Sequence, residues 1–288
     1  MLTINGIDIN KAGLASHFPD GTQLLKAPYP TSAQTPTGSR LQIVFSWRYE
    51  SDEELVSLVF LSKHYRDKYP YAKQGLTMHY APNARMDRVK HDEEVFTLKY
   101  FCQVINDLHF DRVIVLDPHS NVTPALLDRV EVLSPKNAIE NAIHDLHFQE
   151  TDYLYFPDEG AAKRYADLFP DKKNVLIGHK VRDWETGKIQ GLRITTPEGY
   201  EPDDFQCMGR NVIMIDDIIS YGGTLAYSAD KLKELGFEHI YAYATHVENS
   251  ILDKEKGTLL KRLENGTVDR IYTTSSLYSG KHEKITVL

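Results

Sequence analysis

Short apolar runs alternate along most of the chain with longer segments in which apolar residues recur every three or four positions. Runs suited to buried strands occupy residues 41–45, 76–80, 112–116, 152–156, 174–177, 211–215, 239–243 and 269–273. Helical spacing predicts helices over residues 52–68, 93–108, 160–168, 224–235 and 252–263. Strands that alternate with helices predict parallel sheets covered by helices, which is the α/β fold class.

The pattern starts again in the second half of the chain and predicts two related α/β domains. The segment RVIVLDPHS at residues 112–120 is echoed by NVIMIDDII at residues 211–219. We expect a boundary near residue 145, which gives domains 1–145 and 146–288, with the last residues able to pack back on the first domain. Residues 1–40 are poorly patterned and rich in turn residues, so we assign no element there.

One stretch, NVIMIDDIISYGGTLAY at residues 211–227, joins a buried strand to a helix through a polar loop. Asp216 and Asp217 follow the strand, and open α/β sheets bind ligands at this end. Backbone amides, hydroxyl groups and the helix dipole can together hold a phosphate in such a loop. Paired carboxylates beside it suit sugar hydroxyls or Mg²⁺. The alternative is an ordinary turn with two solvated aspartates. The loop residues are Ser220, Tyr221, Gly222, Gly223 and Thr224.

Composition excludes several classes of function. The 41 acidic residues outnumber the 33 basic ones, and no basic stripe is visible, so we expect no nucleic-acid partner. Two cysteines, Cys102 and Cys207, are too few for a disulfide framework or a cysteine-based zinc site. The first residues lack the apolar core of a signal peptide, and no apolar run approaches the ~18 residues that span a bilayer. We expect a cytoplasmic protein without a membrane partner.

Residues 216–224 resemble the loop of phosphoribosyltransferases that binds phosphoribosyl diphosphate (PRPP), in which two acidic residues precede Asp-Thr-Gly-Gly-Thr. That loop occurs in enzymes that consume PRPP and in the synthetase that makes it. Further stretches, in the family's order and roughly at its spacing, resemble the ribose-phosphate diphosphokinase (PRPP synthetase) family over nearly the whole chain. The resemblance implies two phosphoribosyltransferase-like domains, each a mainly parallel sheet flanked by helices.

Two of these stretches imply an ATP site. FPDGT at residues 18–22 is similar to the family's Phe-Ser-Asp-Gly-Glu, which reaches across a dimer interface to the ATP base. Phe18 and Asp20 would then contact ATP, and the protein would be a homo-oligomer, a dimer or larger. ARMDR at residues 84–88 is similar to Ala-Arg-Gln-Asp-Arg and places Arg85, Met86 and Asp87 at ATP, with methionine in place of the family's glutamine. A surface turn and a solvated charged loop are the respective alternatives.

Three more stretches imply metal-binding and catalytic residues. His119 in DPHS would ligate the Mg²⁺ of ATP or orient its phosphates, and Asp158 in PDEG would be a second Mg²⁺ ligand. Lys180 and Arg182 stand at the root of the family's catalytic flap and face the same way in an extended chain. The alternatives are a packing histidine, a helix cap and a solvated hairpin.

The implied reaction moves the β,γ-diphosphoryl group of MgATP to the anomeric hydroxyl of ribose 5-phosphate and releases AMP. Phosphoryl transfer needs in-line positioning and cations where charge builds up. The aspartate pair would hold ribose hydroxyls, and residues 220–224 the 5-phosphate. His119 and Asp158 would hold the metal, and Lys180 and Arg182 the charge of the transition state.

The chain departs from the family where Ser220 and Tyr221 replace Asp-Thr. The change should reshape the phosphate pocket, and a phosphate that continues into a nucleotide would suit a more open one, with the tyrosine ring available for stacking. ADP-ribose is such a molecule, and phage-type relatives diphosphorylate it for NAD⁺ rebuilding. The same chemistry on ADP-ribose is therefore an alternative.

Two other functions remain open at this stage. A phosphoribosyltransferase that consumes PRPP shares residues 211–227 but does not need the DPHS and ARMDR stretches or a second α/β half. A non-catalytic regulatory homologue is expected to have lost flap cations or metal ligands, whereas Lys180, Arg182, His119 and Asp158 are all present.

Overall fold

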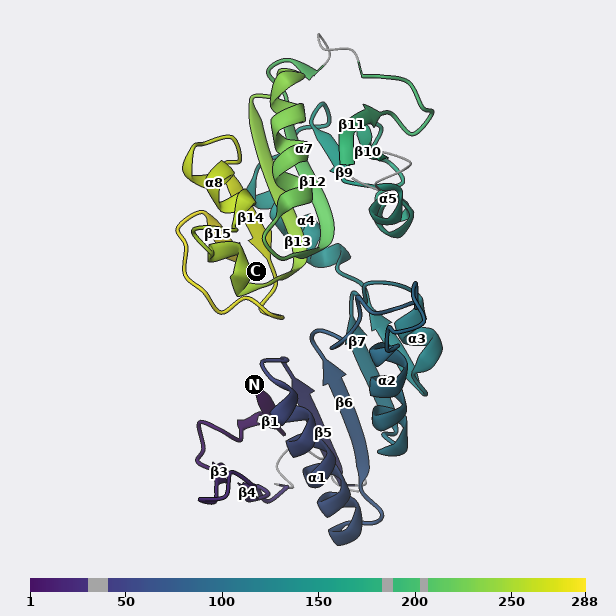
Figure 1. Cartoon of the computed structure of the whole chain (residues 1–288), viewed down its shortest axis with the longest axis vertical. Coiled ribbons are helices and arrows are strands. Elements are labelled where there is room, and N and C mark those ends of the chain that lie inside the picture. Colours follow the sequence, from purple (N-terminus) through teal and green to yellow (C-terminus); the bar gives the residue numbers. More distant parts are fainter. Residues whose placement is uncertain (31–40, 183–188, 203–206) are drawn as a thin grey trace. The chain divides into compact units, whose positions relative to one another are not determined.

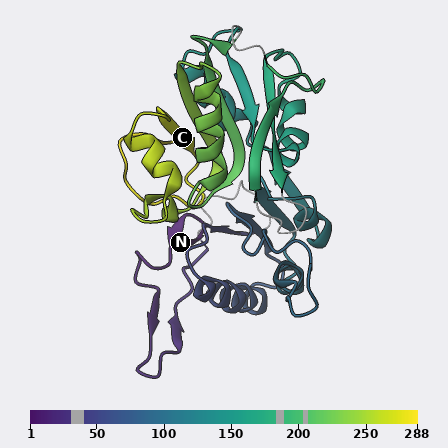
Figure 2. The same ribbon diagram turned by 45° about the horizontal axis from the view of Figure 1, so that its top comes forward.

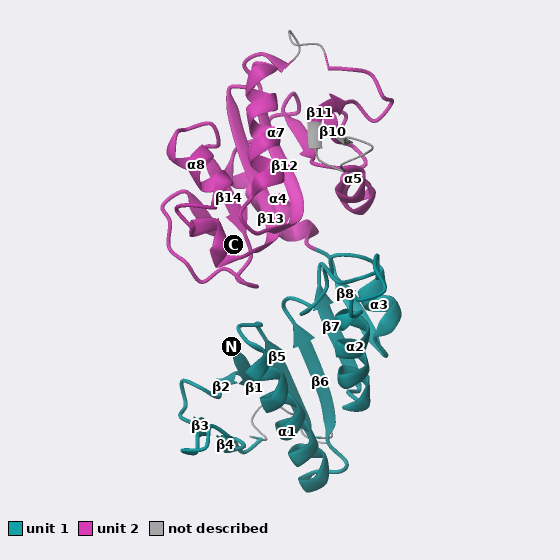
Figure 3. Ribbon diagram, viewed as in Figure 1, with its two compact units in different colours: residues 1–134 teal, residues 135–288 magenta. Residues whose placement is uncertain are grey.

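The computed structural model describes residues 1–30, 41–182, 189–202 and 207–288, without the side chains of residues 180–190. The described chain forms two compact units, Met1–Ser134 and Pro135–Leu288 (Figure 3). Each unit has its own mainly parallel sheet with helices packed on it. The predicted fold class is therefore confirmed. Among the described residues, no helix is both long enough and apolar enough to cross a membrane.

In its described part, the first unit contains a six-stranded sheet in the order β2-β1-β5-β6-β7-β8 (Figure 1). Strands β5 to β8 are parallel, and β1 and β2 add an antiparallel edge. Side chains from α1 and α2 share one buried cluster with β5, β6 and β7. The elements are β1 (Leu2–Ile4), β2 (Ile7–Asp8), β5 (Gln42–Trp47), α1 (Asp52–Lys68), β6 (Lys73–Met78), α2 (Thr97–Asp107), β7 (Arg112–Leu116), α3 (Val122–Leu126) and β8 (Val130–Leu133).

A short antiparallel hairpin, β3 (Ala15–His17) and β4 (Gln23–Leu25), projects from this unit (Figure 2). Its end next to the turn is fixed to α1, because the Gln23 side-chain amide donates to Ser57 Oγ at 2.9 Å and to Glu53 Oε1 at 3.1 Å. The four short strands β1 to β4 lie in residues 1–40, the poorly patterned region of the sequence. Runs of two or three residues are too short to produce a readable alternation.

In the described part of the second unit, a seven-stranded sheet has the order β11-β10-β9-β12-β13-β14-β15. Neighbouring strands are parallel except for β11, which pairs antiparallel with β10. The elements are α4 (Lys136–Asp145), β9 (Tyr153–Phe156), α5 (Glu159–Tyr165), η2 (Ala166–Leu168), β10 (Val175–Arg182), β11 (Ile189–Thr195), β12 (Asn211–Ile219), α7 (Gly223–Glu234), β13 (His239–Val247), η3 (Asn249–Leu252), α8 (Thr258–Glu264), β14 (Arg270–Thr273) and β15 (Ile285–Val287).

Both faces of this sheet are covered, which explains the continuous apolar run of β12. Val212 and Met214 belong to the cluster that contains side chains of α7 and α8. Ile213 and Ile215 belong to the cluster that contains side chains of α4 and α5. Successive side chains of a strand point to opposite faces, so an uninterrupted apolar run fills two cores.

The division at residues 134 and 135 lies at the other end of α4 from the expected boundary near residue 145. Ile139 and Ala142 of α4 are fully buried in the cluster that contains Tyr243 and Tyr272. The Tyr272 hydroxyl also donates to Asp145 Oδ2 at 2.6 Å. Helix α4 therefore packs as part of the second unit.

Two of the predicted helices differ clearly from the structure. Helix α2 begins at Thr97, not near residue 93. The helix predicted over residues 252–263 is interrupted after η3 and resumes as α8 at Thr258. Asp253 causes this break, because its Oδ1 accepts the backbone N–H groups of Glu255 and Lys256, both at 2.9 Å. A side chain that satisfies backbone donors in this way competes with helix formation.

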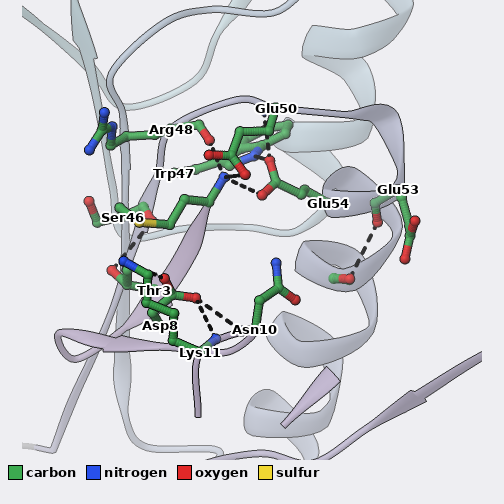
Figure 4. A network of polar contacts seen from close by, with 12 residues as sticks. Thr3, Asp8, Asn10, Lys11, Ser46, Trp47, Arg48, Glu50, Glu53 and Glu54 are labelled. Carbon is green, nitrogen blue, oxygen red and sulfur yellow. Dashed lines mark hydrogen bonds and ion pairs between the residues drawn. The ribbon is translucent and has the colours of Figure 1, made fainter. Parts of the chain in front are cut away.

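A buried carboxylate joins the first turn of α1 to the end of β5 (Figure 4). Glu54 is only 6% exposed, and its Oε2 accepts the Trp47 indole N–H and the Glu50 backbone N–H, both at 2.9 Å. The Met1 ammonium group pairs with the same carboxylate. The network fixes the end of β5 against the first turn of α1.

We predict that Glu54→Ala lowers the free energy of unfolding by about 2 kcal/mol, because two buried N–H donors lose their acceptor. The urea midpoint measures this change. Glu93→Ala, at an exposed position of the same unit, should change it by less than ~0.5 kcal/mol. Equal effects of the two substitutions would contradict the account of this network.

Candidate active site

Three carboxylates gather where β9 ends beside β12. The two strands are parallel, with Met214 opposite Tyr155, and this register brings Asp158, just after β9, beside the aspartate pair of β12. The sequence predicts that Asp216 and Asp217 follow the strand. They lie within it instead, because β12 continues to Ile219. Its pairing with β13 extends to Ile219, opposite Val247, and keeps the aspartates in extended backbone.

The two aspartates have different surroundings. Asp217 is 5% exposed, and its Oδ1 lies 3.2 Å from Nη1 of Arg164 on α5. Asp216 accepts the backbone N–H of Asp217 at 2.9 Å. Burial, together with the negative charges of Asp217 and Asp158, raises the pKa of Asp216 well above its usual range. The edge of the sheet is therefore electronegative, which suits a cation or the hydroxyl groups of a sugar.

Asp158 caps helix α5. Its Oδ1 accepts the backbone N–H of Ala161 at 3.0 Å, so the capping role considered from the sequence is present. A carboxylate has two oxygens and several lone pairs, so capping and metal binding do not exclude each other.

The loop before α7 is supported from behind by the first turn of α8. The Tyr221 carbonyl accepts the backbone N–H groups of Thr258 at 2.9 Å and Leu259 at 3.2 Å, and the Thr258 hydroxyl at 2.9 Å. Gly222 has a φ of +78° and precedes the helix as its N-cap. A Cβ at Gly222 would overlap the Leu259 side chain, so the backbone needs glycine for two reasons. The result is a rigid turn at the N-terminus of a twelve-residue helix.

The strand that carries the predicted flap cations lies beside β9. Lys180 and Arg182 are backbone members of β10, opposite Leu192 and Ile189 of β11, and their side chains lie outside the described part. Gly178 allows β10 to lie close to the segment after β9, because a Cβ at Gly178 would lie 2.8 Å from the Pro157 carbonyl oxygen.

His179 fixes this strand on both sides. Its Nε2 lies 2.9 Å from Thr195 Oγ1 of β11, and its Nδ1 lies 3.5 Å from Oε1 of Glu159, the first residue of α5. His179 directly precedes Lys180 and lies beside Glu159, the residue after Asp158.

The residues predicted to bind ATP lie in the first unit. Arg85, Met86 and Asp87 occupy the loop after β6, and His119 follows β7. Because β6 and β7 are neighbouring parallel strands, both loops lie at the same edge of the sheet. Arg85 is exposed, and Asp87 Oδ1 lies 3.7 Å from Nε of Arg88.

Phe18 and Asp20 lie elsewhere, at the tip of the β3–β4 hairpin. Phe18 is 48% exposed. Asp20 Oδ1 accepts the Thr22 hydroxyl at 2.7 Å and the Thr22 backbone N–H at 2.9 Å, and these bonds lower the pKa of Asp20. The tip therefore has a fixed conformation and an accessible aromatic ring.

Comparison with known proteins shows what the chain is similar to. No family model matches the chain. The chain is 27% identical over 233 residues to the ribose-phosphate pyrophosphokinase of Thermococcus kodakarensis, covering 80% of this chain and 75% of that protein. It is 26% identical over 286 residues to the same-named protein of Sulfurisphaera tokodaii, covering 95% and 90%. The chain is thus similar to ribose-phosphate pyrophosphokinases over most of its length. The predicted resemblance to this family and the predicted enzyme class are confirmed.

The fold agrees with this family. The phosphoribosylpyrophosphate synthetase of Mycobacterium smegmatis superposes with a TM-score of 0.71 over 95% of this chain and 84% of that one, at 19% identity. The likeness confirms the expected fold of two phosphoribosyltransferase-like domains.

Several residues at the edge of the second sheet were not assigned from the sequence. Arg164, Ser250 and Leu259 contact the aspartate pair or the loop, and Glu248 accepts a hydrogen bond from Ser250. Only Arg164 had a signal, since it ends the stretch that resembles the ribose-phosphate pyrophosphokinase motif around Asp158. Glu248 and Ser250 follow β13, whose sequence carries no loop motif, and they lie near the loop because β13 pairs with β12. Leu259 belongs to α8.

We predict opposite effects for alanine at the two loop glycines. Gly222→Ala should lower the free energy of unfolding by at least ~2 kcal/mol, from left-handed strain and overlap with Leu259. Gly223→Ala should leave it unchanged or raise it by up to ~1 kcal/mol, because its Cβ would meet only Thr258 Oγ1 at 3.8 Å and alanine favours the first helical turn. Urea unfolding of both variants measures the difference, and equal destabilisation would contradict this geometry.

Proposed function

We propose that the protein transfers the diphosphoryl group of MgATP to the anomeric hydroxyl of a ribose 5-phosphate moiety. The hydroxyl oxygen forms a bond to the β-phosphorus of ATP and gives its proton to water, the bond from that phosphorus to the α-phosphate oxygen breaks, and AMP leaves with that oxygen. With ribose 5-phosphate the product is PRPP. The observation that carries the proposal is the glycine turn, which α8 holds in place beside the carboxylates of Asp216 and Asp217, in a chain similar to this family.

The acceptor site lies at the carboxyl edge of the second sheet. Gly222 is the N-cap of α7, and Gly223 and Thr224 begin the helix, whose N-terminal amides and dipole favour a phosphate group. Asp216 and Asp217 accept hydrogen bonds from the ribose hydroxyls. The sugar is thereby held at both ends, which orients the anomeric hydroxyl for an in-line reaction.

The donor site uses residues of the first unit. Arg85 contacts ATP, where a guanidinium can stack on the base or pair with phosphate. Met86 and Asp87 complete that loop, and His119 faces the phosphates. Phe18 and Asp20, at the hairpin tip, serve the ATP site of a neighbouring copy in a homo-oligomer. Lys180 and Arg182 stabilise the charge that develops on the transferred group.

The residues fit a Mg²⁺ ion that is bound jointly by protein side chains and by the phosphates of the substrate. Among the described residues, no group of three or more histidine, cysteine or acidic side chains is placed to hold a metal by itself. Mg²⁺ is commonly bound by one or two carboxylates together with substrate phosphates and water. Burial and the negative charges of Asp217 and Asp158 raise the pKa of Asp216, and a cation at this position would reduce the repulsion between these carboxylates, which supports the proposal. Asp158 and His119 would hold Mg²⁺ with ATP, where it would neutralise phosphate charge.

ADP-ribose is a second candidate acceptor, and Tyr221 favours it. The ring is 39% exposed at the loop, with Nζ of Lys256 5.9 Å from its centroid. An exposed ring next to a cation suits a phosphate that continues into a nucleotide, and the chemistry at the terminal ribose is unchanged. In that case the protein serves NAD⁺ rebuilding.

The compartment and partners are part of the proposal. We place the protein in the cytoplasm, where both cysteines, which are buried and not bonded as disulfides, remain reduced. Its partners are ATP, the acceptor and further copies of itself, not nucleic acid or membrane.

The direct test is acceptor-dependent AMP formation. With MgATP, we expect AMP at the rate of acceptor consumption when ribose 5-phosphate or ADP-ribose is added, and none without an acceptor or with excess chelator. The faster acceptor identifies the substrate. Absence of AMP with both acceptors would overturn the proposal and favour a PRPP-consuming transferase or a non-catalytic homologue.

A second prediction concerns the flap cation. Lys180→Ala should lower kcat at least ~100-fold with a small change in KM, because the charge acts on the transition state. Lys63→Ala removes the same charge from an exposed position on α1 and should leave kcat unchanged. A Lys180→Ala enzyme with full turnover would remove this residue from the mechanism.

A further inference from the structure

A chain of hydrogen bonds runs from the glycine loop to a carboxylate at the end of β13. Ser220 Oγ lies 3.2 Å from Ser250 Oγ, and Ser250 Oγ lies 3.0 Å from Glu248 Oε2. The backbone N–H of Glu248 donates to the Ile219 carbonyl at 2.8 Å. Glu248 and Ser250 are half-buried. The three side chains are therefore fixed next to the end of β12.

The direction of these hydrogen bonds follows from counting protons. An ionised carboxylate can only accept, so Ser250 must donate its proton to Glu248. A hydroxyl group has one proton, so the proton in the bond between the serines must come from Ser220. Ser220 Oγ therefore presents only lone pairs to a ligand in the loop.

The acceptor character of Ser220 Oγ affects which phosphate group the loop binds. A doubly charged phosphate monoester has only acceptor oxygens, so Ser220 cannot donate to it and repels it. A singly charged phosphate, in which a second oxygen is esterified, places less negative charge opposite Ser220. In the sequence alone, Ser220 is a hydroxyl that can donate to phosphate. The hydrogen-bond chain removes that capacity.

We propose that Glu248, acting through Ser250, is a specificity-determining residue that holds Ser220 as a hydrogen-bond acceptor and favours ribosyl acceptors whose phosphate carries one negative charge. This inference rests on the proposed function, because it concerns the phosphate end of the acceptor. Glu248 does not contact the ligand and acts as a positioning residue.

Ser250→Ala tests the proposal, because it removes the acceptor of the Ser220 proton. The Kd for ribose 5-phosphate should fall about tenfold, the effect of one hydrogen bond to a charged group. The Kd for ribose 5-(methyl phosphate), which is singly charged, should change less than ~2-fold. Calorimetric titration with Mg²⁺ and a non-hydrolysable ATP analogue measures both constants without turnover.

Three further variants make the test specific. Ser250→Thr keeps the hydroxyl group and should leave the Kd values for both ligands as in the wild-type protein. Glu248→Ala frees the proton of Ser250 and should change the ratio of the two constants in the same direction as Ser250→Ala. Glu255→Ala removes a carboxylate from an exposed position in the following turn and should leave the ratio unchanged.

The outcomes separate this inference from the proposed function. If the wild-type protein binds neither ribose phosphate, the proposed function fails and this inference fails with it. If the wild-type protein binds them but Ser250→Ala and Glu248→Ala leave the ratio unchanged or weaken ribose 5-phosphate, only the assignment of Glu248 and Ser250 is wrong.

Discussion

The contact between the first turn of α8 and the loop before α7 is the constraint on which the candidate site depends. The Tyr221 carbonyl receives three hydrogen bonds from Thr258 and Leu259, and Gly222 packs against the Leu259 side chain in a left-handed conformation. These contacts fix the backbone before a ligand arrives. A phosphate can then be bound by amides that need no reorganisation, which is the usual reason that glycine-rich turns occur at helix N-termini.

The second constraint is electrostatic. Parallel pairing of β9 with β12 brings Asp158 beside Asp216 and Asp217, and burial makes the full charge of this set unfavourable without a counter-charge. Arg164 balances part of it through Asp217. The remaining charge can interact with sugar hydroxyls and a metal, so the same burial that raises the pKa of Asp216 prepares the edge for its ligands.

The sequence predicted much of the fold, because the strands of the second unit have long apolar runs and α1 and α7 have regular helical spacing. The bounds of α1 and β7 were correct, and the glycine turn was located from its residues. The sequence could not reveal Glu248 and Ser250, which reach the loop only because β13 pairs with β12. It also could not show the break at Asp253, where side-chain capping overrides an apolar pattern.

The central claim is that the backbone amides of the glycine turn bind the phosphate of a ribosyl acceptor. Hydrogen–deuterium exchange of residues 221–225 tests it directly, with ribose 5-phosphate, ADP-ribose or unphosphorylated ribose added to the protein with Mg²⁺ and a non-hydrolysable ATP analogue. We expect slower exchange of these amides with at least one phosphorylated ligand and no change with ribose. Exchange that stays unchanged with saturating ribose 5-phosphate and also with saturating ADP-ribose would contradict the account.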